Sequence, residues 1–305
     1  MAHVHYRQYY WCFLIMTVLP KLAYSKGDCD CGIGGEPVSS KIYGGSVAFS
    51  DEYPWMAHLR FFDKVGGTRY GMCGGFLIDS RHVMTAAHCI METQTKVRKI
   101  EATEVYLGVH DLSKLNTAHK VNTFYYPANY KQYDLSNDIA ILQLANPVNF
   151  TKKIRPICLP KSDDEPYKRL IVAGFGRLGP NMDTSTLLMH VNVEYIPNPK
   201  CNEMIKDYFI RNNPDIKKDP DRYDIPKVHD THMCCVDKST GGDACRGDSG
   251  GALMYKKDGR YYAVGIVSGA FDECGDPRTP GFYTIVRKFR ELIGKATKDA
   301  KFCSF

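Results

Sequence analysis

The residues with the clearest chemical potential are a histidine, an aspartate and a serine in three separate motifs. His88 stands in the segment TAAHC, Asp138 begins the apolar segment DIAIL, and Ser249 lies among glycines in GDSGG. A serine hydroxyl is a poor nucleophile until a base takes its proton, and histidine can do so because its pKa lies near neutrality. A buried carboxylate can hold the tautomer of that histidine, and glycines let backbone N–H groups approach a developing oxyanion.

Each motif alone is weakly specific, but their order His, Asp, Ser in a cysteine-rich chain is highly specific. From Ile42 to about Ala296 the chain resembles the trypsin-like family of chymotrypsin-fold serine proteases. The GDSGG context and the chain order differ from those of lipase-type hydrolases. The resemblance implies that His88 is the general base, Asp138 its orienting carboxylate and Ser249 the nucleophile, with the N–H groups of Gly247 and Ser249 forming the oxyanion hole.

The resemblance also implies activation by proteolysis. Lys41 and Ile42 begin the segment KIYGG, which is similar to the cleavage site of the family's zymogens. Cleavage after Lys41 would free the ammonium group of Ile42, and a newly buried charge needs a partner. The matching partner is Asp248, so activation would be a two-state switch that orders the oxyanion hole and the substrate pocket.

The residues around the substrate pocket indicate a preference for basic side chains. Asp243 matches the family position at the pocket base, where a buried carboxylate selects Arg or Lys. Gly281 matches the glycine that keeps the pocket wall open. The rim departs from the family pattern, because the usual Ser-Trp-Gly is replaced by Ser268, Gly269 and Ala270. The missing aromatic side chain keeps an alternative open, a catalytically weak or inactive homologue that acts as a binding or toxin protein.

The cysteines fit the same family frame. The resemblance pairs Cys158 with a propeptide cysteine, either Cys29 or Cys31, and leaves the remaining one of these two without an assigned partner, together with Cys235 and Cys303. The other expected disulfides are Cys73–Cys89, Cys201–Cys234 and Cys245–Cys274.

Other motifs are expected to carry little chemistry. His229, His232, Cys234 and Cys235 have a zinc-like spacing, but a disulfide at Cys234 would remove that possibility. No metal and no cofactor are expected. Asn149, in the segment NFT, is a candidate N-glycosylation site on a surface turn.

The elements that must position these residues are short strands. Apolar runs of strand length alternate with Gly, Pro, Asp and Asn, which is typical of an all-β sandwich or barrel. The resemblance implies two antiparallel six-stranded β-barrels packed around a central cleft, at about 42–155 and 156–285. Apolar residues at three- and four-residue steps, from Val286 to Ala296, predict a C-terminal α-helix at about 285–298.

Composition and the N-terminal segment bound the class of protein. The chain has 305 residues, 44% hydrophobic and 24% charged, which excludes a disordered, collagenous or coiled-coil protein. No apolar run is long enough to span a bilayer, and a net charge of +6 spread along the chain gives weak support for nucleic-acid binding. Arg7 and the apolar segment from Trp11 to Leu19 predict a signal peptide at 1–25.

The sequence therefore predicts a secreted, extracellular endopeptidase that cleaves after Arg or Lys. A propeptide is expected at 26–41 and the protease domain at 42–305. Expected partners are protein substrates with Arg or Lys at the cleavage site, an activating trypsin-like protease and macromolecular inhibitors, with neither nucleic acid nor membrane. Similarity to secreted arthropod proteases indicates a venom or hemolymph protease. The long polar stretch between Cys201 and Cys234 is either a tolerated surface insertion or an exosite that restricts protein substrates.

Overall fold

The computed structural model describes residues 30–35, 45–160, 169–219, 222–239, 243–271 and 274–298. The expected signal peptide, the cleavage site at Lys41 and Ile42, and the cysteines Cys29 and Cys303 lie outside these residues. Within the described residues, no helix is long and apolar enough to cross a membrane.

The first half of the chain forms a closed antiparallel barrel. Its strands follow one another around the ring in the order β2-β3-β4-β9-β8-β7. A short hairpin, β5–β6, extends from it, and the short helix α1 follows β4. The bounds are β2 Met56–Phe62, β3 Tyr70–Leu77, β4 His82–Thr85, α1 Ala87–Ile90, β5 Met91–Thr93, β6 Lys96–Val97, β7 Thr103–Leu107, β8 His119–Tyr125 and β9 Ala140–Leu144, with 3-10 turns at Ile100–Ala102 and Leu112–Lys114.

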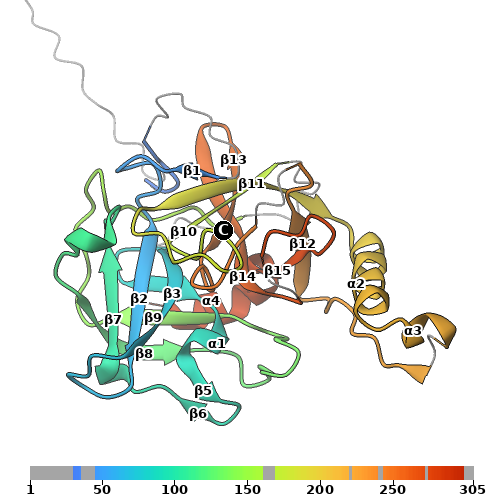
Figure 1. Cartoon of the computed structure of the whole chain (residues 1–305). Helices are drawn as coiled ribbons and strands as arrows, with labels where there is room; N and C mark the ends of the chain where they lie inside the picture. The colour runs from blue at the N-terminus through green and yellow to red at the C-terminus, as the bar shows by residue number, and fades with distance from the viewer. Residues whose placement is uncertain are drawn as a thin grey trace, which may run out of the picture.

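The second half forms another antiparallel ring beside the first (Figure 1). Its order is β11-β10-β13-β14-β15-β12, and pairing between β11 and β12 closes it, while the short strand β1 adds to β11. The predicted pair of six-stranded barrels is therefore confirmed. The bounds are β1 Ser46–Val47, β10 Leu170–Gly174, β11 Met189–Ile196, α2 Asn198–Asn212, α3 Asp215–Lys218, β12 His232–Val236, β13 Ala252–Lys257, β14 Arg260–Ala270 and β15 Gly281–Ile285.

Apolar side chains join the two barrels into one body. A large core cluster fills the first barrel and continues to Tyr261 and Ile266 of the second, while a separate cluster around Tyr283 fills the second barrel. Trp55 is fully buried between them and donates its indole N–H to the sulfur of Met254 at 3.1 Å. Burying such a large aromatic side chain contributes on the order of 2–3 kcal/mol, so this contact helps to fix the cleft between the barrels.

The C-terminal helix is also confirmed, with a small difference at its start. Residues Val286–Phe289 form a 3-10 turn, and the α-helix proper, α4, spans Arg290–Ala296. Val286, Phe289, Ile293 and Ala296 are buried in the large core cluster that fills the first barrel. The helix that follows the last strand of the second barrel therefore returns to pack against the first.

Four disulfides tie loops to this frame. The structure contains Cys73–Cys89, Cys201–Cys234 and Cys245–Cys274, and it joins Cys158 to Cys31 rather than to Cys29. Residues 30–35 are docked on the body beyond this bond, since Gly32 donates its N–H to the carbonyl of Pro156 at 2.8 Å. Cys235 is buried and makes no disulfide to any described cysteine.

The stretch between Cys201 and Cys234 carries two helices that project from the second barrel, away from the first (Figure 1). Helix α2 is anchored by the Cys201–Cys234 bond and by the buried side chain of Ile205. Tyr208 and Phe209 of α2 pack on Phe271, and the Tyr208 hydroxyl donates to the Phe271 carbonyl at 3.0 Å. The insertion is therefore attached to the end of β14, which leads to the pocket rim.

Candidate active site

The three motif residues meet at the cleft from both barrels. His88 lies on α1, directly after β4, and Asp138 lies two residues before β9, so both come from the first barrel. Ser249 belongs to the loop that precedes β13 of the second barrel. Strands β4 and β9 are paired, Thr85 with Ala140, and this register brings the histidine and the aspartate together.

His88 and Asp138 form a two-point contact. Nδ1 of His88 lies 2.7 Å from Oδ2 of Asp138, and the backbone N–H of His88 donates to Oδ1 at 2.8 Å. Burial lowers the pKa of His88, but the charge of Asp138 and its hydrogen bond outweigh burial, so the net pKa is raised. The histidine side chain keeps 22% of its surface exposed, which leaves it open to the cleft. A base with this orientation and pKa can accept a proton near neutral pH.

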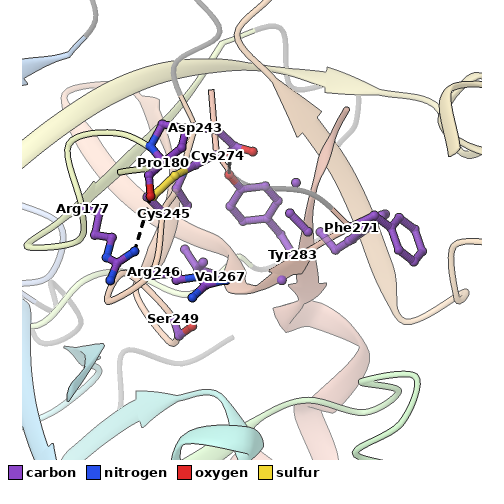
Figure 2. A pocket seen from close by; sticks show the side chains of 15 residues that line it. Arg177, Pro180, Asp243, Cys245, Arg246, Ser249, Val267, Phe271, Cys274 and Tyr283 are labelled. Atoms are coloured by element: carbon purple, nitrogen blue, oxygen red, sulfur yellow. Dashed lines mark hydrogen bonds between the residues drawn. A yellow bond between two sulfur atoms is a disulfide. The ribbon is translucent and has the colours of Figure 1, made fainter. Parts of the chain in front are cut away.

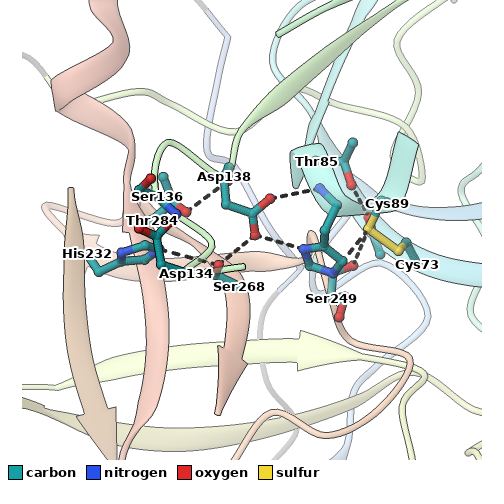
Figure 3. Close-up of polar contacts among 12 residues, drawn as sticks. Cys73, Thr85, Cys89, Asp134, Ser136, Asp138, His232, Ser249, Ser268 and Thr284 are labelled. Atoms are coloured by element: carbon teal, nitrogen blue, oxygen red, sulfur yellow. Dashed lines mark hydrogen bonds and ion pairs between the residues drawn. A yellow bond between two sulfur atoms is a disulfide. The ribbon is translucent and has the colours of Figure 1, made fainter. Parts of the chain in front are cut away.

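Asp138 is completely buried and fully paired (Figure 3). Besides His88, Ser268 donates its hydroxyl to Oδ2 at 2.6 Å, and Thr284 donates its hydroxyl to the backbone carbonyl of Asp138 at 2.8 Å. Burial raises the pKa of Asp138, but the His88 charge and the hydrogen bonds from His88 and Ser268 outweigh it, so the net pKa is lowered. Asp138 therefore stays ionised and fixes the imidazole.

Ser249 is held next to this pair through its backbone. Its carbonyl accepts the N–H of Gly74 at 2.7 Å. The Cys89 sulfur lies 3.8 Å from Nε2 of His88 and 3.6 Å from the Ser249 carbonyl oxygen, so the disulfide at Cys89 lies between the two motifs. Among the described residues, the Ser249 hydroxyl has no hydrogen bond, including none to His88. Ser249 is half-buried.

The backbone before Ser249 has the conformation that an oxyanion site needs. Gly247 has φ of 106°, in the region that favours glycine. Across the part of the chain that the structure describes, the N–H groups of Gly247 and Ser249 have no acceptor. Two free N–H groups beside a nucleophile can bind a developing oxyanion.

A cavity of about 330 Å³ opens beside Ser249 and ends at Asp243 (Figure 2). Oδ1 of Asp243 accepts the Tyr283 hydroxyl and the Ala244 N–H, both at 2.7 Å. A β-carbon on Gly281 would lie 2.7 Å from Oδ2 of Asp243, so this glycine makes room for the carboxylate. Ala270 also lines the cavity, whereas Ser268, expected in the pocket, does not, because its hydroxyl points to Asp138.

The carboxylate at this base has no counter-charge among the described residues. Burial raises the pKa of Asp243 to about 7, with a further rise from Asp248, although the hydrogen bonds from Tyr283 and Ala244 oppose it. A half-buried carboxylate with two neutral donors favours a cationic ligand that supplies the missing charge. The cavity can therefore take a guanidinium or ammonium side chain.

Asp248 is buried and is another carboxylate without a cation among the described residues. It accepts the N–H of Gly176 at 2.7 Å and that of Cys245 at 2.9 Å. Burial raises its pKa to about 6, and these two backbone donors limit the rise. Asp248 lines another cavity, of about 340 Å³, that Gly45 also lines. Gly45 stands three residues after Ile42, whose own position lies outside the described residues.

Two potential metal clusters do not fit a metal. Cys73, His88 and Cys89 lie within 4.8 Å of one another, but both sulfurs belong to a disulfide and offer no thiolate. The zinc-like spacing around His232 fails for the same reason, because Cys234 is bonded to Cys201. Asn149 is exposed, as a glycosylation acceptor must be.

Several residues of this region were not singled out from the sequence. Tyr283 donates to Asp243 and Thr284 holds the backbone of Asp138. Their only sequence signal is that they closely follow Gly281 in the segment PGFYT. Phe271 lies two residues after Gly269, where it lines the cavity and packs on α2. All three residues make contacts with residues far away in the sequence, and no local sequence pattern reveals such contacts.

Comparison with known proteins places this geometry in a family. The family profile described as Trypsin matches residues 42–293. The clotting factor G beta subunit of Tachypleus tridentatus is 33% identical over 273 residues, covering 87% of this chain and 82% of that protein. The proclotting enzyme of the same organism is 33% identical over 282 residues, covering 87% of this chain and 68% of the relative.

Proposed function

The chain belongs to the trypsin family of serine proteases, and from this premise we propose that it is an active, secreted endopeptidase that cleaves after Arg or Lys. The observation that carries the proposal is that Ser249, which lines a cavity with Asp243 at its base, lies beside the His88–Asp138 pair, with the Cys89 sulfur in contact with both His88 and Ser249. Family membership alone would not decide activity, because one fold hosts many functions.

The proposed chemistry uses the chain's own groups at each step. The Ser249 hydroxyl oxygen attacks the carbonyl carbon of the scissile bond while its proton passes to Nε2 of His88. The oxyanion that forms accepts hydrogen bonds from the N–H groups of Gly247 and Ser249. His88 then gives the proton to the leaving amine, and water hydrolyses the acyl-enzyme by the same steps with water as nucleophile. Asp138 stays ionised and stabilises the charged imidazole throughout.

The proposed substrate preference follows from the carboxylate at the pocket base. An Arg or Lys side chain would enter the 330 Å³ cavity and place its cation against Asp243. The cation would stabilise the ionised carboxylate and so offset the burial that raises the pKa of this group to about 7. An apolar side chain of the same length would leave the carboxylate uncompensated, which is costly in a buried site.

Activation is proposed to depend on a similar pairing of a cation with a buried carboxylate. Cleavage after Lys41 would create an ammonium group at Ile42, and the cavity beside Asp248 offers it a partner. An ion pair there would give the Asp248 carboxylate a cationic partner, in addition to the two backbone N–H groups that now donate to it. The propeptide would stay attached through the Cys31–Cys158 disulfide after cleavage.

Hydrolysis of an arginine peptide tests the proposed function. The protein cut after Lys41 is expected to hydrolyse a chromogenic peptide ending in arginine, while the Ser249→Ala variant, cut in the same way, gives no hydrolysis above buffer. Equal rates for the two proteins would contradict the proposal, since Ser249 is the proposed nucleophile.

One observation favours a second candidate, a weak or inactive homologue that acts by binding. Gly269 lacks the aromatic side chain usual at this position of the rim, and a side chain there would meet Leu135, whose Cδ1 lies 2.9 Å from the place of a β-carbon. A protein that binds the arginine peptide but does not hydrolyse it would support this candidate. The intact set of His88, Asp138 and Ser249 favours the active enzyme.

The insertion between Cys201 and Cys234 is proposed to restrict protein substrates. A cavity of about 610 Å³ lies between this insertion, the segment 132–135 and the rim residues Ala270 and Phe271. It shares Ala270, Phe271 and Phe282 with the pocket that ends at Asp243, so a bound polypeptide can reach both. Lys227 lines this cavity, whereas Lys217 on α3 does not.

Charge reversal at this cavity tests the restriction. Lys227→Glu is expected to slow cleavage of a native protein substrate severalfold and to leave an arginine peptide unaffected. Lys217→Glu, on the same insertion, is the matched control and is expected to change neither rate. Equal effects of Lys227→Glu on protein and peptide would contradict an exosite.

The names of the relatives support a role in a proteolytic cascade. Two proteins described as a clotting factor subunit and a proclotting enzyme share 33% identity with this chain. We therefore place the chain in an extracellular proteolytic cascade, with a trypsin-like protease that activates it, a protein substrate downstream and macromolecular inhibitors as partners.

A further inference from the structure

A buried histidine outside the three motifs lies at the far side of Asp138. His232 begins β12 and is 3% exposed. Its Nε2 lies 3.4 Å from the hydroxyl oxygen of Ser268, which itself lies 2.6 Å from Oδ2 of Asp138 (Figure 3). Histidine, serine and aspartate thus form a chain of contacts that ends at the carboxylate facing His88.

The direction of these hydrogen bonds follows from the distances. A hydroxyl has one hydrogen, and the short 2.6 Å contact to a carboxylate assigns it to the bond from Ser268 to Asp138. The Ser268 oxygen is then an acceptor toward His232. A bare Nε2 would face it lone pair to lone pair, so the contact is favourable only when Nε2 carries the proton.

The same part of the chain also holds the loop before Asp138. Leu135 and Asn137 have φ of 55° and 59°, a left-handed conformation that costs a leucine about 1 kcal/mol. The N–H of Asn137 donates to the hydroxyl of Thr231 at 3.4 Å, and the ring of His232 contacts the backbone of Leu135. His232 therefore stands between the strained loop and the serine that holds Asp138.

We propose that His232 is a positioning residue, which donates from Nε2 to Ser268 and thereby strengthens the hydrogen bond that Asp138 receives. The inference rests on the proposed function, because its effect on catalysis passes through Asp138 and His88. Hydrogen bonds in a chain polarise one another, so a donor behind Ser268 makes its hydroxyl a stronger donor. A carboxylate that is better solvated by Ser268 attracts the proton of His88 less.

The charge state of His232 fits this role. Burial lowers its pKa to about 4 and His229 adds to the shift, although the carboxylates of Asp138 and Asp134 and a hydrogen bond to the Leu135 backbone oppose it. His232 is therefore neutral when His88 titrates, and one ring proton must serve either Ser268 or Leu135. The charged groups that face His88 are Asp138 and Arg98, and neither changes when His232 is replaced.

Nitrogen NMR of histidine-labelled protein tests the proposal without any substitution. At neutral pH, the ¹⁵N shifts of His232 are expected to show a neutral ring with the proton on Nε2. A proton on Nδ1 with bare Nε2 would overturn the proposal, since Ser268 would then receive no donor. This measurement needs a folded protein and no turnover, so it stands even if the wild-type protein hydrolyses nothing and the proposed function fails.

Two variants test the consequence for His88. His232→Met keeps an apolar side chain of similar size without a donor, and the pKa of His88, followed by NMR, is expected to rise by a few tenths, with a severalfold lower kcat and an unchanged KM. His232→Gln places an amide donor near the same point and is expected to restore both. An unchanged His88 pKa in either a folded Met variant or a Ser268→Ala variant would overturn the proposal, as would a Gln variant that behaves like Met.

Discussion

The carboxylates on the two sides of the cleft have different partners. Asp138, from the first barrel, is completely buried, and His88 and Ser268 both bond its side chain, so its pKa lies below the usual value. Asp243 and Asp248, from the second barrel, are held by neutral donors alone within the described residues. Their pKa values rise to about 7 and about 6 because burial is uncompensated.

The difference separates a carboxylate whose partners the fold provides from carboxylates whose cationic partners must come from elsewhere. On the first side, a histidine and a hydroxyl of this chain give the carboxylate its partners. On the second side, two cavities border carboxylates that have no cation partner in the part of the chain that the structure describes. In the proposed function the cations arrive from outside the described residues. The substrate brings one to Asp243, and the freed ammonium of Ile42 brings the other to Asp248.

The largest effect is expected when Asp138, whose partners the fold provides, loses its negative charge. Asp138→Asn cannot accept from His88 and hold its tautomer, so kcat/KM for an arginine peptide is expected to fall about 10⁴-fold with the fold retained. Asp79→Asn is the matched control, because Asp79 and His82 form another buried pair on the same barrel, with 2.8 Å between Nδ1 and Oδ2. If both variants lost activity equally, a general loss of stability would explain the effect instead.

The next effect concerns the pocket base. Asp243→Ser removes the charge that a basic side chain would meet, and kcat/KM for the arginine peptide is expected to fall roughly 1,000-fold, about 4 kcal/mol. Asp276→Asn serves as the control, because Asp276 pairs with Arg278 and does not line the pocket. Retention of arginine-peptide hydrolysis by Asp243→Ser would show that Asp243 does not select the substrate.

A smaller effect is expected at Asp248, the proposed partner of the Ile42 ammonium. Asp248→Asn cannot form an ion pair with the ammonium of Ile42, and loss of a buried pair costs about 3 kcal/mol, or roughly 100-fold in activity of the cut form. The rate before and after cleavage at Lys41 measures it, and the gain on cleavage is expected to disappear. A gain equal to that of the wild-type protein would contradict the pairing.

The smallest effect is a pH dependence of ligand binding. Because the pKa of Asp243 is about 7 in the free protein, its ionised fraction rises between pH 6 and 8. Affinity of the cut Ser249→Ala variant for p-aminobenzamidine, measured by fluorescence, is therefore expected to rise roughly tenfold over this range. An affinity that stays flat with pH, or that falls, would contradict a raised pKa at this site.

The raised pKa of Asp243 also lowers the stability of the folded protein as the pH rises. A carboxyl whose pKa is raised on folding favours the unfolded state once it ionises. For Asp243 this cost is absent below pH 3.8, grows as the pH rises and is complete above about 7. A bound cation removes the cost, so ligand stabilisation should be larger at pH 8 than at pH 6.

Sequence reasoning predicted the parts of the molecule that have local signals. The strand-length apolar runs indicated an all-β protein, and the resemblance implied the two barrels and the disulfides Cys73–Cys89, Cys201–Cys234 and Cys245–Cys274. The helical period from Val286 to Ala296 predicted the C-terminal helix, although its first turn is a 3-10 helix. These features depend on residues close in sequence or on motifs that identify the family.

The features that were missed either have a local signal that other residues obscure or depend on long-range register. Helix α2 lies in the stretch interpreted as a polar insertion, although Cys201, Ile205, Tyr208 and Phe209 recur at helical spacing along it. Charged residues between them and Pro199 at its start obscured that signal. The contact between His232 and Ser268 joins β12 to β14 across β15, and no pattern within either strand shows it. The choice of Cys31 over Cys29 also needed the fold, because both lie in one short segment.

In the proposed function, the substrate cation and the freed ammonium of Ile42 complete the charge pairs of Asp243 and Asp248 on the second side of the cleft. Hydrolysis of an arginine peptide by the same preparation before and after a single cut at Lys41 tests this most directly. We expect negligible activity in the intact chain and a large gain on cleavage, absent in a cut Ser249→Ala control. Full activity in the intact, uncleaved chain would contradict the account.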